Sequence, residues 1–154
     1  MVLPPVFRHL TSRLKMTSLP PISSRLCELH PKVPLPNGTI PGRFHNLFVS
    51  SSVPPQADEP DLSDSAVGAG LHVAEGGINF RVTDVAPRTK GQMHRTPTID
   101  FLVVHRGTIT LHLEGDERVT VKEGEAVVQR ATMHAWENET DEWVRMFVVL
   151  VAVA

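Results

Sequence analysis

A succession of short segments with strand character begins after Gly76-Gly77 and continues to the end of the chain. The first, Ile78 to Val85, alternates apolar and polar residues with a period of two, which is typical of a half-buried β-strand. Further segments of this kind span residues 99–105, 108–113, 118–121, 126–129, 134–137 and 143–153. Turn signals lie between several of them, at Arg106-Gly107, Glu114-Gly115-Asp116 and Lys122-Glu123-Gly124. Many short strands at this spacing, with no helical period between them, predict an all-β sandwich or closed barrel.

Composition limits the classes of protein that fit this pattern. A chain of 154 residues is long enough for one domain with a real core and too short for two ordinary ones. The net charge of −2 gives no field that would attract phosphates, so nucleic acid is not expected as a partner. No stretch approaches the roughly 18 apolar residues of a membrane-spanning helix, so no membrane association is expected. The single cysteine, Cys27, can form no disulfide within the chain, and we expect a cytoplasmic protein.

The first 40 residues differ in character from the rest. Met1 to Cys27 contains four basic residues and no acidic one, which is the composition of a transit peptide. Prolines at positions 4, 5, 20 and 21 interrupt any amphipathic helix there. We therefore expect residues 1–40 to be a flexible or arm-like segment, with mitochondrial targeting as the alternative and Met16 as a candidate second start.

Residues 31–69 are dominated by prolines, serines and the acidic run Asp58-Glu59-Pro60-Asp61, which predicts mainly loop. One apolar patch, Phe44 to Val49, interrupts this segment. A short strand gains stability only by pairing, so the patch is expected to add a strand to the barrel or to a neighbouring subunit. We place a single barrel domain at residues 41–154, with its motif-bearing part at residues 76–154.

Two spaced sets of polar residues carry a family resemblance. The first is His94-Arg95-Thr96-Pro97-Thr98-Ile99-Asp100, with Gly107 seven positions after Asp100. In spacing it resembles the first cupin motif, H-x-H-x3-E-x6-G, although Thr96 stands where that family has its second histidine and Asp100 where it has glutamate. The second cupin motif, G-x5-P-x-G-x2-H-x3-N, is similar to the run from Gly124 to Asn138, in which His134 and Asn138 keep their spacing. Gln129 and Ala131 replace the proline and the glycine, and the first gap is one residue short.

Three short segments resemble those of single-domain cupins that lack the second metal histidine and are frequent in fungi and bacteria. They are Met93-His94-Arg95-Thr96, Val128-Gln129-Arg130 and 134–138. Some fungal members act in polyketide pathways as tailoring enzymes for dehydration, cyclisation or aromatisation. The resemblance covers about half of the chain and does not reach the first 70 residues. It implies a cupin-type jelly-roll β-barrel, here with a loop-rich, partly extended N-terminal arm.

Strand geometry indicates where the chemistry gathers. In an extended strand His94, Thr96, Thr98 and Asp100 point the same way, and so do His134 and Trp136, so two strands can aim polar groups at one apolar interior. His94, Asp100 and His134 are therefore the candidate catalytic residues. They are also the candidate ligands of a divalent metal (Fe, Zn, Mn or Ni), because two imidazoles and a carboxylate suit a cation with open positions. In the alternative, the histidines bond to Asp100 or to backbone without a metal, or Asp100 only orients one of them.

The candidate substrate-binding residues around this set are Arg95, Thr96, Thr98, Gln129, Trp136 and Phe80. Arg95 and Arg130 either clamp a substrate carboxylate or enolate, or form salt bridges at the barrel mouth. Gln129 is read as a surface or turn residue, with a position facing the metal as the alternative. Trp136 and Phe80 are read as core residues, with a stacking role as the alternative. His105 and His112 are expected to be exposed.

The leading hypothesis is a lyase or isomerase that binds a small, largely apolar carbonyl compound, polyketide-like or otherwise, inside the barrel. It would move a proton next to the carbonyl, with dehydration, isomerisation or cyclisation following from an enolate, with or without a divalent metal. The alternatives are a non-haem Fe(II) oxygenase, a decarboxylase, and a ligand-binding cupin without catalysis. The last segment, Trp143 to Val153, is apolar on both faces and must be covered, which predicts a homodimer formed by sheet packing.

Overall fold

The computed structural model of the chain describes residue 3 and residues 6–11, 22–27, 30–31, 41–56, 73 and 76–153. The elements within these residues are β1 (Val6–Thr11), β2 (Ile22–Cys27), β3 (His30–Pro31), β4 (Gly42–Ser50), β5 (Ile78–Val85), β6 (Thr89–Lys90), β7 (Thr98–Arg106), β8 (Thr108–Leu113), the 3₁₀ turn η1 (Glu114–Asp116), β9 (Arg118–Lys122), β10 (Ala126–Arg130), β11 (His134–Asn138) and β12 (Val144–Ala152). The prediction of an all-β fold is confirmed. In this part of the chain, no helix has the length and apolar character needed to cross a membrane.

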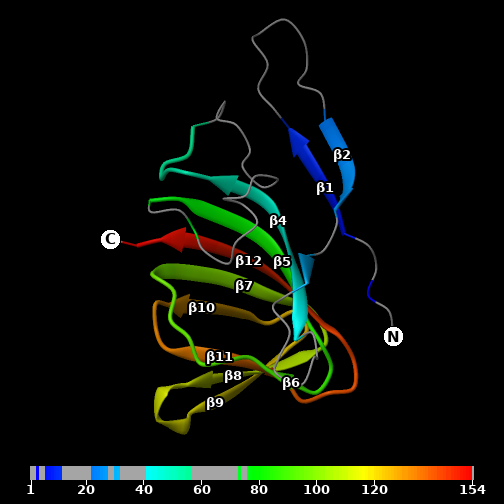
Figure 1. Ribbon diagram of the computed structural model, residues 1–154, viewed down its shortest axis with the longest axis vertical. Coiled ribbons are helices and arrows are strands. Elements are labelled where there is room, and N and C mark those ends of the chain that lie inside the picture. The colour runs from blue at the N-terminus through cyan, green and yellow to red at the C-terminus, as the bar shows by residue number, and fades with distance from the viewer. Residues whose placement is uncertain are drawn as a thin grey trace, which may run out of the picture.

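Two antiparallel sheets form the barrel. The larger has the strand order β10-β7-β12-β5-β4-β3, and the smaller has the order β6-β11-β8-β9. Figure 1 shows β4, β5, β12, β7 and β10 as successive neighbours, with β11, β8 and β9 beyond them. The last strand, β12, lies between β5 and β7, so the chain returns to the middle of a sheet that it has already built. Strands β1 and β2 pair with each other in a sheet of their own.

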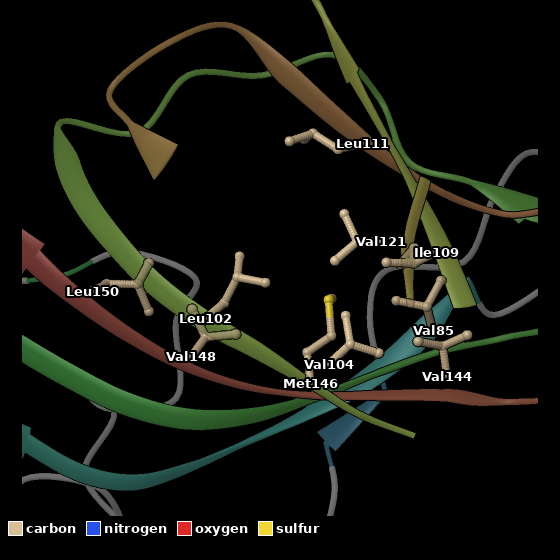
Figure 2. Close-up of a cluster of buried hydrophobic side chains, with 10 residues drawn as sticks. All are labelled: Val85, Leu102, Val104, Ile109, Leu111, Val121, Val144, Met146, Val148 and Leu150. Atoms are coloured by element: carbon tan, nitrogen blue, oxygen red, sulfur yellow. The ribbon is translucent and has the colours of Figure 1, made fainter. Parts of the chain in front are cut away.

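The main apolar core lies between the two sheets. Side chains of β5, β7 and β12 meet side chains of β8 and β9 there, as Figure 2 shows. The cluster consists of Val85, Leu102, Val104, Ile109, Leu111, Val121, Val144, Met146, Val148 and Leu150. Burial of these aliphatic side chains, each at about 1.5–3 kcal/mol, is the main force that holds the sheets together.

The strand register places polar residues at one end of this core. Val148 on β12 is paired with Arg81 on β5 and with Leu102 on β7, so Arg81 faces the same interior as the apolar cluster. Leu150 is paired with Asp100, and Asp100 is paired in turn with Gln129 on β10. Directly paired residues point to the same side of a sheet. The interior therefore passes from apolar to polar along the strands.

A second apolar cluster covers the opposite face of the larger sheet. Leu47 and Val82 are buried there, with Phe80 and Phe147 packed against them. On the same face Asp84 and Arg145 form a buried ion pair, in which the guanidinium Nε and Nη2 donate to the two carboxylate oxygens at 2.7 and 2.8 Å. Because both of its faces are covered, β5 has no side that is simply exposed to solvent.

The backbone conformation explains why glycine stands at two motif positions, Gly107 and Gly124. Gly107 and Gly124 lie in turns with φ of +89° and +84°, a left-handed conformation that residues with a Cβ adopt at a cost. A Cβ on Gly107 would also lie 3.0 Å from Cγ2 of Val144. These positions fix the hairpins that deliver β8 and β10.

Most of the predicted strands are found within one or two residues of their expected bounds. The patch from Phe44 to Val49 lies in β4 and pairs with β5, so it adds a strand to the larger sheet of its own chain. Strands β1, β2, β3 and β6 were not predicted. The acidic run Asp58-Glu59-Pro60-Asp61 and Met16 lie outside the described residues, and the division into residues 1–40 and 41–154 stays a prediction.

Candidate active site

Two histidines that are 40 positions apart in the sequence meet at the polar end of the barrel. His94 precedes β7, and His134 begins β11. The two residues form an isolated antiparallel bridge, with each backbone N–H donating to the carbonyl of the other at 2.9 Å. Their rings lie with centroids 4.4 Å apart. The bridge fixes both backbones, so the rings are held close together by main-chain bonds that do not depend on a ligand.

The same local bond fixes both imidazole tautomers. Nδ1 of His94 lies 2.9 Å from the carbonyl oxygen of Gln92, and Nδ1 of His134 lies 2.9 Å from that of Thr132. A carbonyl oxygen only accepts, so Nδ1 carries the proton in each ring. In its neutral form each ring therefore presents Nε2 as a lone pair, which can accept a proton or bind a cation.

The two rings differ in their environment. His134 is buried, with 2% of its surface exposed, whereas His94 is exposed. Burial lowers the pKa of His134, the Thr132 carbonyl and Asp100 oppose this, and His94 adds to it. The buried ring is thus held in its neutral, basic form at neutral pH. The exposed ring connects it to solvent.

A carboxylate lies near the histidine pair. Asp100 on β7 is buried, and the hydroxyl of Thr98 donates to its Oδ1 at 2.5 Å. The Thr98 oxygen is also 2.9 Å from the hydroxyl of Thr96, which is half-buried. Burial raises the pKa of Asp100, while Thr98, Arg81 and the two histidines oppose the rise. Arg81, His94 and His134 are thus close enough to Asp100 to act on its charge.

Gln129 lies beside Asp100 and supports the loop before His134. It is paired with Asp100 across β10 and β7 and has only 3% of its surface exposed. Its Nε2 donates to the carbonyl of Thr132 at 3.2 Å and to the hydroxyl of the same residue. The expectation that Gln129 is a surface or turn residue is therefore wrong. Its amide bonds to the carbonyl that also holds the ring of His134.

Arg81 is a component of the interior that the sequence did not reveal. The alternation of 78–85 predicts a half-buried strand without saying which face is buried, and in the structure Phe80 and Val82 pack in the outer cluster while Arg81 faces the barrel. Part of its side chain is exposed, yet its Nε is shielded from solvent. Burial lowers the pKa of Arg81 to about 10, against the raising effect of Asp100. The sequence shows an arginine within a strand, but this arginine can be assigned to the barrel interior only after the inward face of the strand is known.

The other candidates divide into residues near the site and residues away from it. Trp136 is half-buried, packs against the main core, and lies edge-on to His134 with centroids 6.1 Å apart. Arg95 is exposed and forms a salt bridge of 3.8 Å with Glu114 at the surface. Phe80 lies on the other face of β5, in the second cluster, so the structure does not bring it to the histidines.

Arg130, His105 and His112 lie away from the histidine pair and differ in their exposure. Arg130 and His105 are exposed, as was predicted for His105. His112 is not exposed, since its ring is half-buried and its Nε2 lies 2.6 Å from a carboxylate oxygen of Glu137. This contact with Glu137 on β11 is one that no pattern in the sequence indicates.

The family resemblance implies a divalent metal held by His94, Asp100 and His134. Across the described ranges, no group of three or more His, Cys, Asp or Glu side chains is arranged to hold a metal ion. His94 and His134 offer two nitrogen donors, but the Asp100 carboxylate is engaged by Thr98 and acted on by the cation of Arg81. Thr96 occupies the place of a third imidazole. These donors do not fit a three-ligand divalent metal.

Comparison with known proteins places this site in a family context. Residues 81–150 match the family described as the cupin domain. The chain is 36% identical over 128 residues to the phomopsin biosynthesis cluster protein C' of Diaporthe leptostromiformis, covering 77% of this chain and 67% of that protein. It is 36% identical over 85 residues to the cupin-domain-containing oxidoreductase fogC of Aspergillus ruber, covering 53% of this chain and 41% of that protein. The chain thus spans about two thirds of the first relative and less than half of the second.

A solved structure has the same fold. The polyketide cyclase RemF from Streptomyces resistomycificus superposes with a TM-score of 0.55 at 15% identity, covering 82% of this chain and 75% of that one. At this identity the likeness concerns the fold alone, and it extends beyond the motif-bearing half of the chain.

Proposed function

Since the chain belongs to the cupin family, as its domain match and its fungal relative show, we propose that it is a tailoring enzyme of secondary metabolism. Its substrate is a small carbonyl compound that enters the barrel beside His94. Its reaction moves a proton at the carbon next to the carbonyl, and dehydration, isomerisation or cyclisation follows from the enolate.

The observation that carries this proposal is the pair of histidine rings with fixed tautomers and unequal burial. Nε2 of His134 takes the proton from the carbon, and the electron pair of the broken C–H bond moves into the carbonyl to give an enolate oxygen. His134, now protonated, returns its proton to another carbon in an isomerisation, or to a departing hydroxyl in a dehydration. General acid and base groups of this kind contribute about 10²–10⁴-fold to a rate.

The surrounding residues suit an apolar substrate with one polar end. Trp136 and the aliphatic side chains of the main core supply an apolar wall beside His134. Asp100 balances the charge that forms on His134 during the reaction, because opposite charges in a buried site attract strongly. His94 lies between this interior and solvent, so it can exchange protons with both.

The names of the relatives supply the context and a second candidate. RemF, which is named a polyketide cyclase, has the same fold, so a barrel of this shape can house a reaction of the proposed kind. The fogC relative is named an oxidoreductase, which favours an oxidative reaction as the second candidate. The two candidates differ in whether oxygen is consumed.

Exchange of hydrogen for deuterium tests the proposal. The protein would be incubated in D₂O with a panel of aryl ketones, 1,3-diketones and aldehydes, and exchange next to the carbonyl followed by NMR. We expect catalysed exchange on at least one class without oxygen uptake, and a loss of about 10²-fold or more in His134→Asn. The matched control, His105→Asn, alters an exposed histidine and should retain the rate.

Oxygen uptake in place of exchange would favour the oxidative candidate. Saturable binding of panel compounds with neither exchange nor oxygen uptake would favour a ligand-binding cupin. Exchange that is equally fast in His134→Asn would exclude His134 as the base.

A further inference from the structure

We propose that Gln129 is a positioning residue of the reaction. Its side-chain amide fixes the carbonyl of Thr132, and through that carbonyl it fixes the tautomer and the orientation of His134. This inference rests on the proposed function, because His134 is the base of that reaction. Gln129 acts through Thr132 and not on the substrate.

The first support is a continuous path of hydrogen bonds within the segment 129–134. Nε2 of Gln129 donates to the carbonyl oxygen of Thr132 at 3.2 Å, and Nδ1 of His134 donates to the same oxygen at 2.9 Å. A carbonyl oxygen has two lone pairs, so it accepts both bonds at once. The amide of Gln129 also donates to the hydroxyl of Thr132. One amide therefore holds both the backbone and the side chain of the residue that orients the ring.

The second support is the burial of this amide behind an exposed residue. Gln129 is paired with Asp100 and has only 3% of its surface exposed, whereas Thr132 is exposed. The peptide group of an exposed residue can turn towards water, and its carbonyl then no longer meets the ring. A buried amide donor opposes this movement, because it costs free energy to leave such a donor without an acceptor. Gln129 thus holds the Thr132 carbonyl on the inner side of the loop.

The third support is the backbone of the residue between them. Ala131 has φ of +50°, in the left-handed region that residues with a Cβ adopt at a cost. The second family motif has glycine here, so the loop lacks the residue that adopts this conformation freely. The N–H of Ala131 donates to the carbonyl of Thr98 at 3.0 Å. A strained residue persists only where neighbouring contacts hold it, and this bond and those of Gln129 are such contacts.

The consequence concerns the nitrogen that acts as the base. While the Thr132 carbonyl holds the proton on Nδ1, the neutral ring of His134 presents Nε2 as a lone pair. If the carbonyl turns away, the ring is free to carry its proton on either nitrogen. A ring with the proton on Nε2 cannot accept another one there. Loss of the Gln129 amide should therefore reduce the fraction of His134 that is able to act.

His94 provides a comparison within the same molecule. Its Nδ1 makes the same kind of bond, at 2.9 Å, to the carbonyl of Gln92, but residues 91–95 are exposed. The amide of Gln129 bonds to Thr132 and so acts on the other loop. A change at Gln129 should alter the tautomer of His134 and leave that of His94 as it is.

Imidazole ¹⁵N NMR of the full chain tests the proposal without a substrate, at about pH 8.5, where an ordinary imidazole is neutral. The ¹⁵N shifts of a ring show which nitrogen carries the proton, and we expect Nδ1–H in both wild-type histidines. Gln129→Met keeps the length of the side chain and removes its donor. It should move the His134 shifts towards a mixture of tautomers and leave the His94 shifts unchanged. The matched control Val127→Ala shortens another β10 side chain, one that packs against the main core, and should keep both tautomers.

The proposal also predicts a change in the reaction itself. On a ketone for which the wild type catalyses deuterium exchange, Gln129→Met should lower kcat by about tenfold or more with little change in KM, because a misplaced base slows the step without weakening binding.

A wild-type His134 with its proton on Nε2, unchanged His134 shifts in Gln129→Met, or an equal change in Val127→Ala would each overturn the proposal. If Gln129→Met does not fold, the wild type decides. Its Gln129 side-chain amide protons should exchange with water about tenfold or more slowly than those of the exposed Gln92, and equal exchange would exclude the bond. The NMR readouts need no substrate, so this proposal and the proposed reaction can fail separately.

Discussion

Single residues set the protonation states of this site through short local bonds. His94 and His134 each bond through Nδ1 to a carbonyl two positions earlier in the chain, and the backbone bridge between them holds the rings together. Neither bond needs a partner from elsewhere in the fold. The tautomers are thus fixed by the two loops that carry the histidines.

The pH dependence of stability should report on His134. Its pKa is lowered by burial from the ordinary value of 6.5, so the stability that its neutral form contributes is present above that value. This contribution is lost as the pH falls below about 6.5, because the unfolded chain then binds a proton that the folded chain resists. His134→Asn keeps a donor for Thr132 and removes the titration. Urea unfolding at about pH 7.5 and about pH 5.5 should therefore show a smaller loss of stability in the variant than in the wild type. An equal loss in both would contradict the burial of a neutral ring.

The hydroxyl of Thr98 should contribute measurably to the stability of the fold. Thr98→Val removes the donor to the buried carboxylate of Asp100 and should cost about 1.5–3 kcal/mol of unfolding free energy, the usual range for a bond to a charged group. Thr98→Ser keeps the hydroxyl and should stay closer to the wild type. Chemical denaturation at neutral pH measures both. Equal stability of the two variants would show that the bond contributes nothing.

Thr96 tests the relation of the site to metal-binding cupins. It is half-buried beside Thr98, at the position where the family motif has its second histidine. Thr96→His would add an imidazole to those of His94 and His134, so calorimetry with Zn²⁺ should show affinity increased by about tenfold or more over the wild type. Tight stoichiometric binding of Zn²⁺ by the wild type would instead show that the native residues suffice.

At the scale of strands, the positions of most elements could be predicted and the faces of some could not. Alternation and turn signals are local, and they located β5 and β7 to β12 within one or two residues. The inward face of β5 could not be predicted because both of its faces are covered, one by the barrel and one by the cluster of Leu47, Val82, Phe80 and Phe147. The assumption that the apolar face of a strand points into the barrel fails for β5, because an apolar cluster also covers the face that points away from the barrel. Arg81 was missed for this reason.

The convergence of His94 with His134 could be predicted from motif spacing, whereas the burial of Gln129 and His112 could not. Gln129 becomes buried through its pairing with Asp100, and His112 through its bond to Glu137 on a neighbouring strand. Both are effects of cross-strand register, which depends on residues far apart in the chain. Strands β1 and β2 lie in a segment whose prolines and basic residues indicated no strand pattern.

The buried ion pair between Asp84 and Arg145 should be the most sensitive link between β5 and β12. Its two hydrogen bonds measure 2.7 and 2.8 Å, and both side chains are almost fully buried. Asp84→Asn leaves a buried guanidinium with a weaker acceptor and should cost about 3–5 kcal/mol in urea unfolding. The double variant Asp84→Leu/Arg145→Met should lose less unfolding free energy than the sum of the losses in Asp84→Leu and Arg145→Met. Additive losses would show that the pair is not coupled.

At the scale of the whole molecule, the larger sheet presents an apolar row on its outer face. Val128 on β10, Phe101 on β7 and Val149 on β12 are directly paired in this order. Val128 and Phe101 are 56% and 49% exposed, and the adjacent Val103 is 44% exposed. Large apolar side chains that adjoin on one face commonly mark an interaction surface.

We therefore expect a homodimer in which this face of one copy packs on the same face of another. Phe101→Lys/Val128→Lys should shift the mass in sedimentation equilibrium from two chains to one at micromolar concentration. Substituting Val119→Lys, an exposed valine on β9 of the smaller sheet, is the control and should leave the dimer intact. A wild-type mass of one chain that does not depend on dilution would exclude this dimer.

We propose that His94 and His134 act together as one proton-transfer unit. The most direct measurement is the rate of deuterium exchange next to a carbonyl in His94→Asn, in His134→Asn and in the double variant, with the best ketone of the panel. Groups that act as a unit are strongly non-additive, so each single change should lower the rate by about 10²-fold or more, and the double variant should be little slower than either. Exchange in the double variant at the wild-type rate would contradict the claim.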